Sequence, residues 1–197
     1  MARCLILYGT TDGHTAKIAR FLGAELAALG AGVNLVEAGT DNPDPYDYDG
    51  VIVAASVHGG RFQRSVTRWA LDHAGQLPAR PNAFLSVCLG VLQQDVKVQQ
   101  NLVAMVGRFT RRTGWKPQRV KLVAGALLYT RYGWLKRVLM RSITKRAGGA
   151  TDVTRDYEYT NWADLREFAE GFLAQLPMPA PAAVSSCESC ACEGAVA

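Results

Sequence analysis

The polar side chains with the clearest chemical potential lie in residues 9–15, which read Gly-Thr-Thr-Asp-Gly-His-Thr. Threonine hydroxyls and the N–H groups at a helix start can together bind a phosphate, and a glycine lets the backbone approach it closely. The segment lacks the lysine and spacing of a P-loop and the G-x-G-x-x-G pattern of dinucleotide sites. An ordinary turn in which Asp12 caps the next helix is an alternative. We predict that a mononucleotide phosphate binds at Thr10, Thr11, Asp12, Gly13, His14 and Thr15.

A strand and a helix are expected on either side of this loop. Residues 4–8 form a short apolar run that is typical of a buried strand. After the loop, Gly30 and Gly32 end a segment in which apolar residues recur at helical spacing. The predicted apolar face consists of Ala16, Ile18, Ala19, Leu22, Leu26 and Leu29. A loop between the first strand and the first helix is where doubly wound α/β sheets bind phosphate.

Strands and helices are predicted to alternate along the rest of the chain. The remaining strands are expected at residues 33–36, 51–55, 83–87 and 120–126. Further helices are expected near residues 66–73, 98–109 and 161–176. The strands are continuously apolar, which indicates a parallel sheet that is covered on both faces. We therefore predict an α/β fold in which residues 1–176 form one domain around a doubly wound, five-stranded parallel sheet of order 2-1-3-4-5.

The first loop resembles the Thr/Ser-rich phosphate loop of the flavodoxin family, which implies a flavodoxin-like fold with FMN as the cofactor. In that family the loops after the third and fourth strands flank the flavin ring. The matching residues are Ser56, Val57, His58, Gly59, Ser86, Val87, Cys88 and Leu89. His58 could stack on the ring or be a solvated side chain, and both alternatives stay open. Cys88 is expected to be a small packed residue and not a redox partner.

Positive charge is concentrated in one half of the chain. Lys and Arg outnumber Asp and Glu by 22 to 17, and residues 96–151 contain thirteen Lys or Arg with no Asp or Glu. A basic half-domain suggests an anionic partner, such as a membrane surface, a nucleic acid or a carboxylated ligand. No recognition motif for nucleic acid accompanies the cations, so we predict no nucleic-acid partner.

An insertion, at about residues 127–160, separates the fifth strand from the last helix. It is too long for an unstructured connection in a compact domain. Residues 132–146 have a helical pattern, with Leu139 and Ile143 on one face and Arg137 and Arg141 on another. An apolar face beside a purely cationic face is typical of a helix that lies in a membrane surface. Because no apolar run reaches the roughly 18 residues of a spanning helix, we expect peripheral binding.

The chain also resembles a narrower family, the menaquinone-dependent protoporphyrinogen dehydrogenases of bacterial haem synthesis, over residues 3 to about 176. The most specific matches are residues 124–132 (Ala-Gly-Ala-Leu-x-Tyr-x-Arg-Tyr) and 148–152 (Gly-Gly-x-Thr-Asp). The resemblance implies that protoporphyrinogen IX is oxidised by FMN and that electrons pass to menaquinone or ubiquinone. No catalytic acid or base can be named from the sequence. The residues expected to contact substrate or membrane are Tyr129, Arg131, Tyr132, Trp134, Arg137 and Arg141.

A soluble flavodoxin-type electron carrier is the main alternative, because it would explain the three loops, although not the insertion. A signalling domain of the same topology would need acidic residues at the strand ends, and residues 8–9 and 55–56 provide none. The first strand begins within three residues of Met1, which leaves no room for a signal peptide. We therefore expect the cytoplasmic side of the inner membrane, and a homo-oligomer stays open.

The C-terminal segment, residues 177–197, is rich in Pro, Ala and Ser and is expected to be disordered. It carries Cys187, Cys190 and Cys192. A closed zinc site needs four ligands, and no histidine lies nearby. We predict no metal site in the chain.

Overall fold

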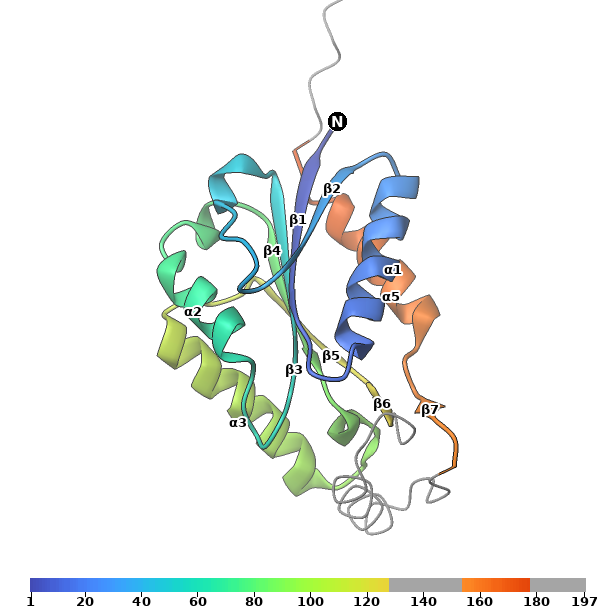
Figure 1. Cartoon of the computed structure of the whole chain (residues 1–197). Helices are drawn as coiled ribbons and strands as arrows, with labels where there is room; N and C mark the ends of the chain where they lie inside the picture. Colours follow the sequence, from blue (N-terminus) through green and yellow to red (C-terminus); the bar gives the residue numbers. More distant parts are fainter. Residues whose placement is uncertain (128–153, 178–197) are drawn as a thin grey trace, which may run out of the picture.

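The computed structural model describes residues 1–127 and 154–177, which form a twisted parallel sheet with helices on both faces (Figure 1). The sheet has five strands in the order β2-β1-β3-β4-β5, as predicted. The first four strands are longer than their predicted apolar runs by one residue at one or both ends, and the fifth is shorter than predicted. The strands are β1 (Arg3–Gly9), β2 (Gly32–Glu37), β3 (Gly50–Ser56), β4 (Asn82–Val87) and β5 (Arg119–Val123).

In the described part of the chain, two helices cover each face of the sheet. Helices α1 (His14–Ala28) and α5 (Trp162–Leu173) lie side by side on one face (Figure 1). Helices α2 (Arg64–Asp72) and α3 (Val96–Thr113) lie on the other. Short 3-10 helices occupy the connections, namely η1 (Pro45–Asp47), η2 (Leu77–Ala79) and η3 (Leu89–Leu92).

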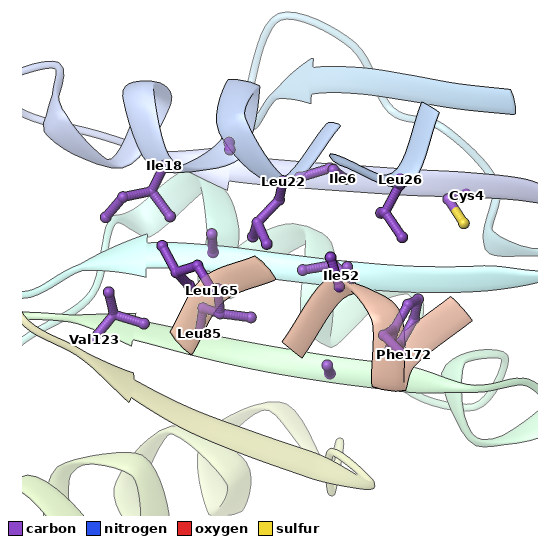
Figure 2. Packing of buried hydrophobic residues seen from close by; sticks show 14 of the residues in the cluster. Cys4, Ile6, Ile18, Leu22, Leu26, Ile52, Leu85, Val123, Leu165 and Phe172 are labelled. Carbon is purple, nitrogen blue, oxygen red and sulfur yellow. The ribbon is translucent and has the colours of Figure 1, made fainter. Parts of the chain in front are cut away.

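Side chains of each inner strand alternate between two buried clusters. Figure 2 shows the cluster under α1 and α5, where Ile6 and Ile52 of the sheet meet Leu22 and Phe172 of the helices. The opposite cluster joins Phe84 of the sheet to α2 and α3. Full burial of β3 and β4 side chains on both faces confirms the interpretation of their continuous apolar runs.

The predictions fail at two margins of the fold. The edge strands β2 and β5 are not covered on both faces, since Leu35 is 37% exposed and Val120 is 46% exposed. At the end of the first helix, Leu29 is the C-terminal cap and is 45% exposed, so it does not belong to the apolar face. Both errors have one cause: apolar side chains also occur on edge strands and at helix ends, where no neighbouring element covers them.

The fifth strand is shorter than the predicted 120–126. It ends at Val123, and the chain turns so that β6 (Ala126–Leu127) pairs antiparallel with β7 (Tyr157–Glu158) outside the main sheet. The register places Ala126 opposite Glu158 and Leu127 opposite Tyr157. The predicted insertion therefore leaves and returns through a two-stranded ribbon, while its predicted helix, 132–146, and the segment 178–197 lie outside the described residues.

Candidate functional site

A cavity of about 310 Å³ opens beyond the carboxyl ends of β1, β3 and β4. Ligands of doubly wound sheets bind at this edge. Three loops and the turn after β5 form its walls. The lining residues are Thr10, Asp12, His14, Thr15, Ser56, Val57, His58, Gly59, Val87, Cys88, Leu89, Gly90, Leu102, Gly125 and Ala126.

The first loop presents an uncapped helix start to this cavity. Gly13 is the N-cap of α1 with a φ of 89°, a left-handed conformation that favours glycine, and no side chain caps the helix there. The N-cap is therefore Gly13 and not Asp12, the residue of the alternative. Thr10 shapes the loop instead, because its Oγ1 accepts a hydrogen bond of 2.9 Å from the Gly13 N–H. The first turn of α1 contains no acidic residue, so its N–H groups suit an anion.

Three residues predicted for the cofactor do not line the cavity: Thr11, Gly13 and Ser86. The Oγ1 of Thr11 accepts a hydrogen bond of 3.2 Å from Gln63 Nε2 at the start of α2. Ser86 is buried on the face of β4 that it shares with Phe84, because strand side chains alternate, and its hydroxyl has no hydrogen-bond partner among the described residues. The loops at the cavity are the predicted ones, but the side chains of Thr11 and Ser86 point away from it, and Gly13 has no side chain. Contact of these three residues with the cofactor stays a prediction.

The loop after β3 is a tight turn. His58 and Arg61 exchange two backbone hydrogen bonds of 2.9 and 3.1 Å, and Gly59 has a φ of 56°. The side chain of His58 is exposed at the cavity wall, so ring stacking and solvation both stay open for it. Across the cavity, burial raises the pKa of the half-buried Cys88 thiol above its usual range. The thiol therefore stays protonated at neutral pH, in agreement with a packed residue.

Four lining residues were missed by sequence reasoning, namely Gly90, Leu102, Gly125 and Ala126. Gly125 and Ala126 follow the end of β5, so the rule that ligands bind at carboxyl ends would have found them if the strand had been predicted to stop at Val123. Leu102 is on α3 and reaches the cavity through packing alone, for which the sequence carries no local signal.

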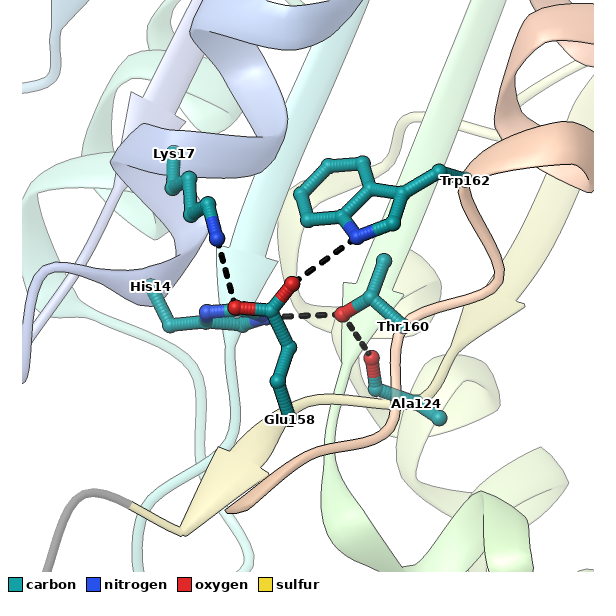
Figure 3. Close-up of polar contacts among 6 residues, drawn as sticks. All are labelled: His14, Lys17, Ala124, Glu158, Thr160 and Trp162. Atoms are coloured by element: carbon teal, nitrogen blue, oxygen red, sulfur yellow. Dashed lines mark hydrogen bonds and ion pairs between the residues drawn. The ribbon is translucent and has the colours of Figure 1, made fainter. Parts of the chain in front are cut away.

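A polar network joins the first turn of α1 to the chain that returns from β7 (Figure 3). The His14 Nε2 atom lies 2.7 Å from Thr160 Oγ1, and this hydroxyl donates to the Ala124 carbonyl over 2.7 Å. Because the hydroxyl proton is committed to Ala124, the hydroxyl oxygen accepts from His14, which assigns the imidazole proton to Nε2. A salt bridge of 2.6 Å between Lys17 and Glu158 lies beside it.

The same network makes the protein sensitive to mildly acidic pH. Burial lowers the pKa of His14 below its usual value, and Lys17 acts in the same direction, although Glu158 opposes them. A lowered pKa means that the unfolded chain binds the proton more readily than the folded one. This contribution to the free energy of unfolding is therefore present above about pH 6.5 and is lost as the pH falls through the folded-state pKa.

We expect His14→Gln to flatten this pH dependence. Urea unfolding of wild type between about pH 7.5 and about pH 5.5 should show a falling free energy of unfolding, with a smaller fall in the variant, which cannot titrate at this position. The glutamine amide can still donate a hydrogen bond to Thr160. The comparison therefore isolates the effect of His14 protonation on the free energy of unfolding. Parallel pH profiles for the two proteins would show that His14 is not held neutral.

The six residues predicted to contact substrate or membrane, 129, 131, 132, 134, 137 and 141, lie outside the described residues. The described chain shows only where their segment begins. Ala126 lines the cavity, so residue 128 follows two positions after a cavity wall. The assignment of these six residues stays a prediction.

Comparison with solved structures bears on the fold. Oxidised flavodoxin 1 from Bacillus cereus is 11% identical, with a TM-score of 0.55 over 89% of this chain and 100% of that chain. A flavodoxin from Streptococcus pneumoniae TIGR4 is 18% identical, with a TM-score of 0.52 over the same shares. These likenesses confirm the flavodoxin-like fold.

Sequence comparison identifies the family. A family model described as a flavodoxin domain matches residues 5–154, and membership of this family implies FMN as the cofactor. A protein of Leishmania major named protoporphyrinogen IX dehydrogenase [quinone] is 37% identical over 91% of this chain and 78% of its own. The protein of the same name from Escherichia coli K12 is 33% identical over 85% of this chain and 92% of its own. The chain belongs to the flavodoxin domain family and, within it, to the quinone-dependent protoporphyrinogen IX dehydrogenases, a family of oxidoreductases.

Proposed function

We propose that this protein oxidises protoporphyrinogen IX to protoporphyrin IX in haem biosynthesis and delivers the electrons to a membrane quinone, menaquinone or ubiquinone. The observation that carries the proposal is the 33–37% identity, over most of the chain, to relatives that bear this name. Bound FMN supplies the redox chemistry, by accepting hydride equivalents and releasing electrons. The protein binds and orients the cofactor and the substrate, and its charges set their electrostatic environment.

The residues at the cavity fit this cofactor. Thr10 and Thr15, together with the uncapped N–H groups of α1, would hold the phosphate, because hydroxyl and backbone donors converge there. The loops 56–59 and 87–90 would flank the flavin ring, with Val57 and Leu89 as apolar contacts. The left-handed Gly59 lets the first of these loops turn sharply beside a flat ring.

The insertion would provide the contacts that an electron carrier does not need. Its arginines, Arg131, Arg137 and Arg141, are suited to carboxylates or anionic lipids, because a guanidinium binds such oxygens bidentately. Tyr129, Tyr132 and Trp134 could contact an apolar macrocycle or the lipid interface. Support for a position near the reacting atoms comes from Ala126, which lines the cavity immediately before the insertion.

Turnover separates this function from that of a soluble electron carrier. Under argon, protoporphyrinogen IX mixed with FMN-loaded protein and a menaquinone analogue should yield fluorescent porphyrin, and omission of the quinone should stop the reaction after the bound flavin is reduced. FMN-free protein is the control for spontaneous oxidation. A protein that takes up electrons from a reductase but forms no porphyrin would favour the carrier.

We further propose peripheral attachment to the cytoplasmic side of the inner membrane. None of the described helices is long and apolar enough to cross a bilayer. The support lies in residues 131–146, which contain six cations and no anion. Each cation near an anionic surface contributes about 1 kcal/mol, within a Debye length of about 8 Å at physiological salt.

Charge reversal tests this attachment. The triple variant Arg137→Glu, Arg141→Glu and Lys145→Glu should no longer sediment with anionic vesicles, while its flavin spectrum stays unchanged. Wild type should sediment with anionic but much less with neutral vesicles and should be released by high salt. The proposal would be contradicted if sedimentation with anionic vesicles were the same at low and high salt and the same for wild type and the triple variant.

A further inference from the structure

A second hollow, of about 620 Å³, lies on the other side of the loop that follows β3, between α2 and α3. Five of its lining residues are arginines, and we call it the arginine groove. The lining residues are Gly60, Arg61, Phe62, Arg64, Thr67, Arg68, Met105, Arg108, Phe109 and Arg112. No lining residue is acidic, and none of the five arginines was predicted from the sequence to be a site residue.

The positive charge of the arginine groove is largely uncompensated. Arg68 forms an ion pair of 3.5 Å with Asp72, both side chains being well exposed. Within the described parts of the chain, no carboxylate pairs with the other four arginines. Arg64 and Arg68 are four residues apart on α2, as Arg108 and Arg112 are on α3, and like charges at this spacing destabilise a helix. Repulsion between these arginines lowers the stability of the free protein. An anion bound between the helices would offset this repulsion.

The floor of the groove is apolar and recessed. Met105 and Phe109 are buried, and Phe62 packs edge-on against Phe109 with ring centroids 5.3 Å apart. The arginines are exposed around this floor. A flat membrane surface is matched by apolar side chains that protrude, whereas a hollow with an apolar floor and a cationic rim suits a discrete ligand with an apolar body and anionic groups.

The groove and the cofactor cavity are neighbours. Gly59 lines the cavity and Gly60 lines the groove. Helix α3 runs along both, with Leu102 in the cavity and Met105 and Phe109 in the groove. At 1.5 Å per residue, Phe109 lies about 10 Å beyond Leu102 along the helix, which is within the width of one large macrocycle.

We propose that the arginine groove binds the two propionate carboxylates of the porphyrinogen substrate while its macrocycle reaches over the flavin. This inference rests on the proposed function and deepens it, because it places the carboxylates on α2 and α3. Guanidinium groups bind carboxylates bidentately, so they position the ring as well as attract it.

The test is a comparison of substrate and protein variants in the FMN-loaded, full-length enzyme. Arg108→Gln with Arg112→Gln removes two exposed guanidiniums from α3, and Arg111→Gln with Lys116→Gln removes the same charge from exposed positions outside the groove. Each protein is assayed with protoporphyrinogen IX and with its dimethyl ester, which lacks both carboxylates. Dithionite reduction of the flavin verifies that each variant is folded and loaded.

We expect the groove variant to raise KM for the free acid by about 10- to 100-fold, the range for hydrogen bonds between charged groups, with KM for the ester unchanged. The control variant should resemble wild type with both substrates. Equal effects on acid and ester, or a groove variant that behaves like the control, would overturn the inference. Loss of sedimentation with anionic vesicles, with the ratio of acid to ester unchanged, would also overturn it and would identify a membrane contact.

Failure of the proposed function has a different signature. If wild type oxidises neither the acid nor the ester, the function itself is wrong and the inference falls with it. If wild type oxidises both and the groove variant keeps the wild-type preference for the acid, only the placement of the carboxylates is wrong.

Discussion

Excision of residues 132–146, bridged by a short Gly/Ser linker, is expected to reduce porphyrinogen oxidation by at least about 100-fold, the loss that follows when a substrate is no longer held in position. FMN should remain bound and reducible by dithionite. The ribbon of β6 and β7 makes this outcome physically reasonable, because Leu127 and Tyr157 pair directly and hold the ends of the insertion together. Anaerobic turnover of the variant, measured by porphyrin fluorescence, gives the result.

Removal of residues 178–197 is the matched control for shortening the chain, and it should leave turnover unchanged. Residues 1–177 retain every cavity-lining residue. If the excised protein turned over at the wild-type rate, the insertion would have no part in substrate oxidation, and a simple electron carrier would account for the chain better.

Replacement of Thr10 and Thr15 by alanine should weaken FMN binding by at least about 3 kcal/mol, or on the order of 100-fold or more, at about 1.5–3 kcal/mol for each hydrogen bond to a charged group. Both residues line the cavity beside the uncapped start of α1. Thr10 acts in a second way, because its hydroxyl accepts from the Gly13 N–H and so orders the loop that presents the helix N–H groups. Fluorescence titration of the apoprotein with FMN measures the change.

Thr11→Ala is the matched control in the same loop. Its side chain does not line the cavity, and its hydroxyl is engaged by Gln63. The affinity for FMN should therefore change by less than about 1 kcal/mol, the value of a surface hydrogen bond. A loss at Thr11 as large as that of the double variant, or no loss in the double variant, would show that the phosphate lies elsewhere.

The fold could be predicted because its signals are local. Each inner strand is a continuous apolar run, and each helix repeats its apolar residues at helical spacing, so the strand order follows from a known topology. The end of β5 could not be predicted, since residues 124–126 are as apolar as the strand before them. Pairing with β7, some thirty residues later, decides where the strand stops.

The site was predictable as loops but not as individual side chains. Loops at the carboxyl ends of strands must lie together, and most of the residues predicted there do line the cavity. Ser86 does not line the cavity, because the alternation along β4 turns its side chain to the face that Phe84 occupies. Its contact with the cofactor stays a prediction. The arginine groove is formed by α2 and α3, about forty residues apart in sequence, so only their packing reveals it.

The central claim, that protoporphyrinogen IX reduces the flavin of this protein and a quinone reoxidises it, is tested most directly by one anaerobic mixing experiment. FMN-loaded protein is mixed with protoporphyrinogen IX, the visible flavin absorbance is followed, and a menaquinone analogue is then added. Because porphyrin formation releases six electrons and each flavin accepts two, the protein is supplied in excess over the substrate. We predict that the flavin absorbance is lost as porphyrin absorbance appears, and that it returns when the quinone is added. Flavin that dithionite can reduce but that stays oxidised in the presence of protoporphyrinogen IX would contradict the account.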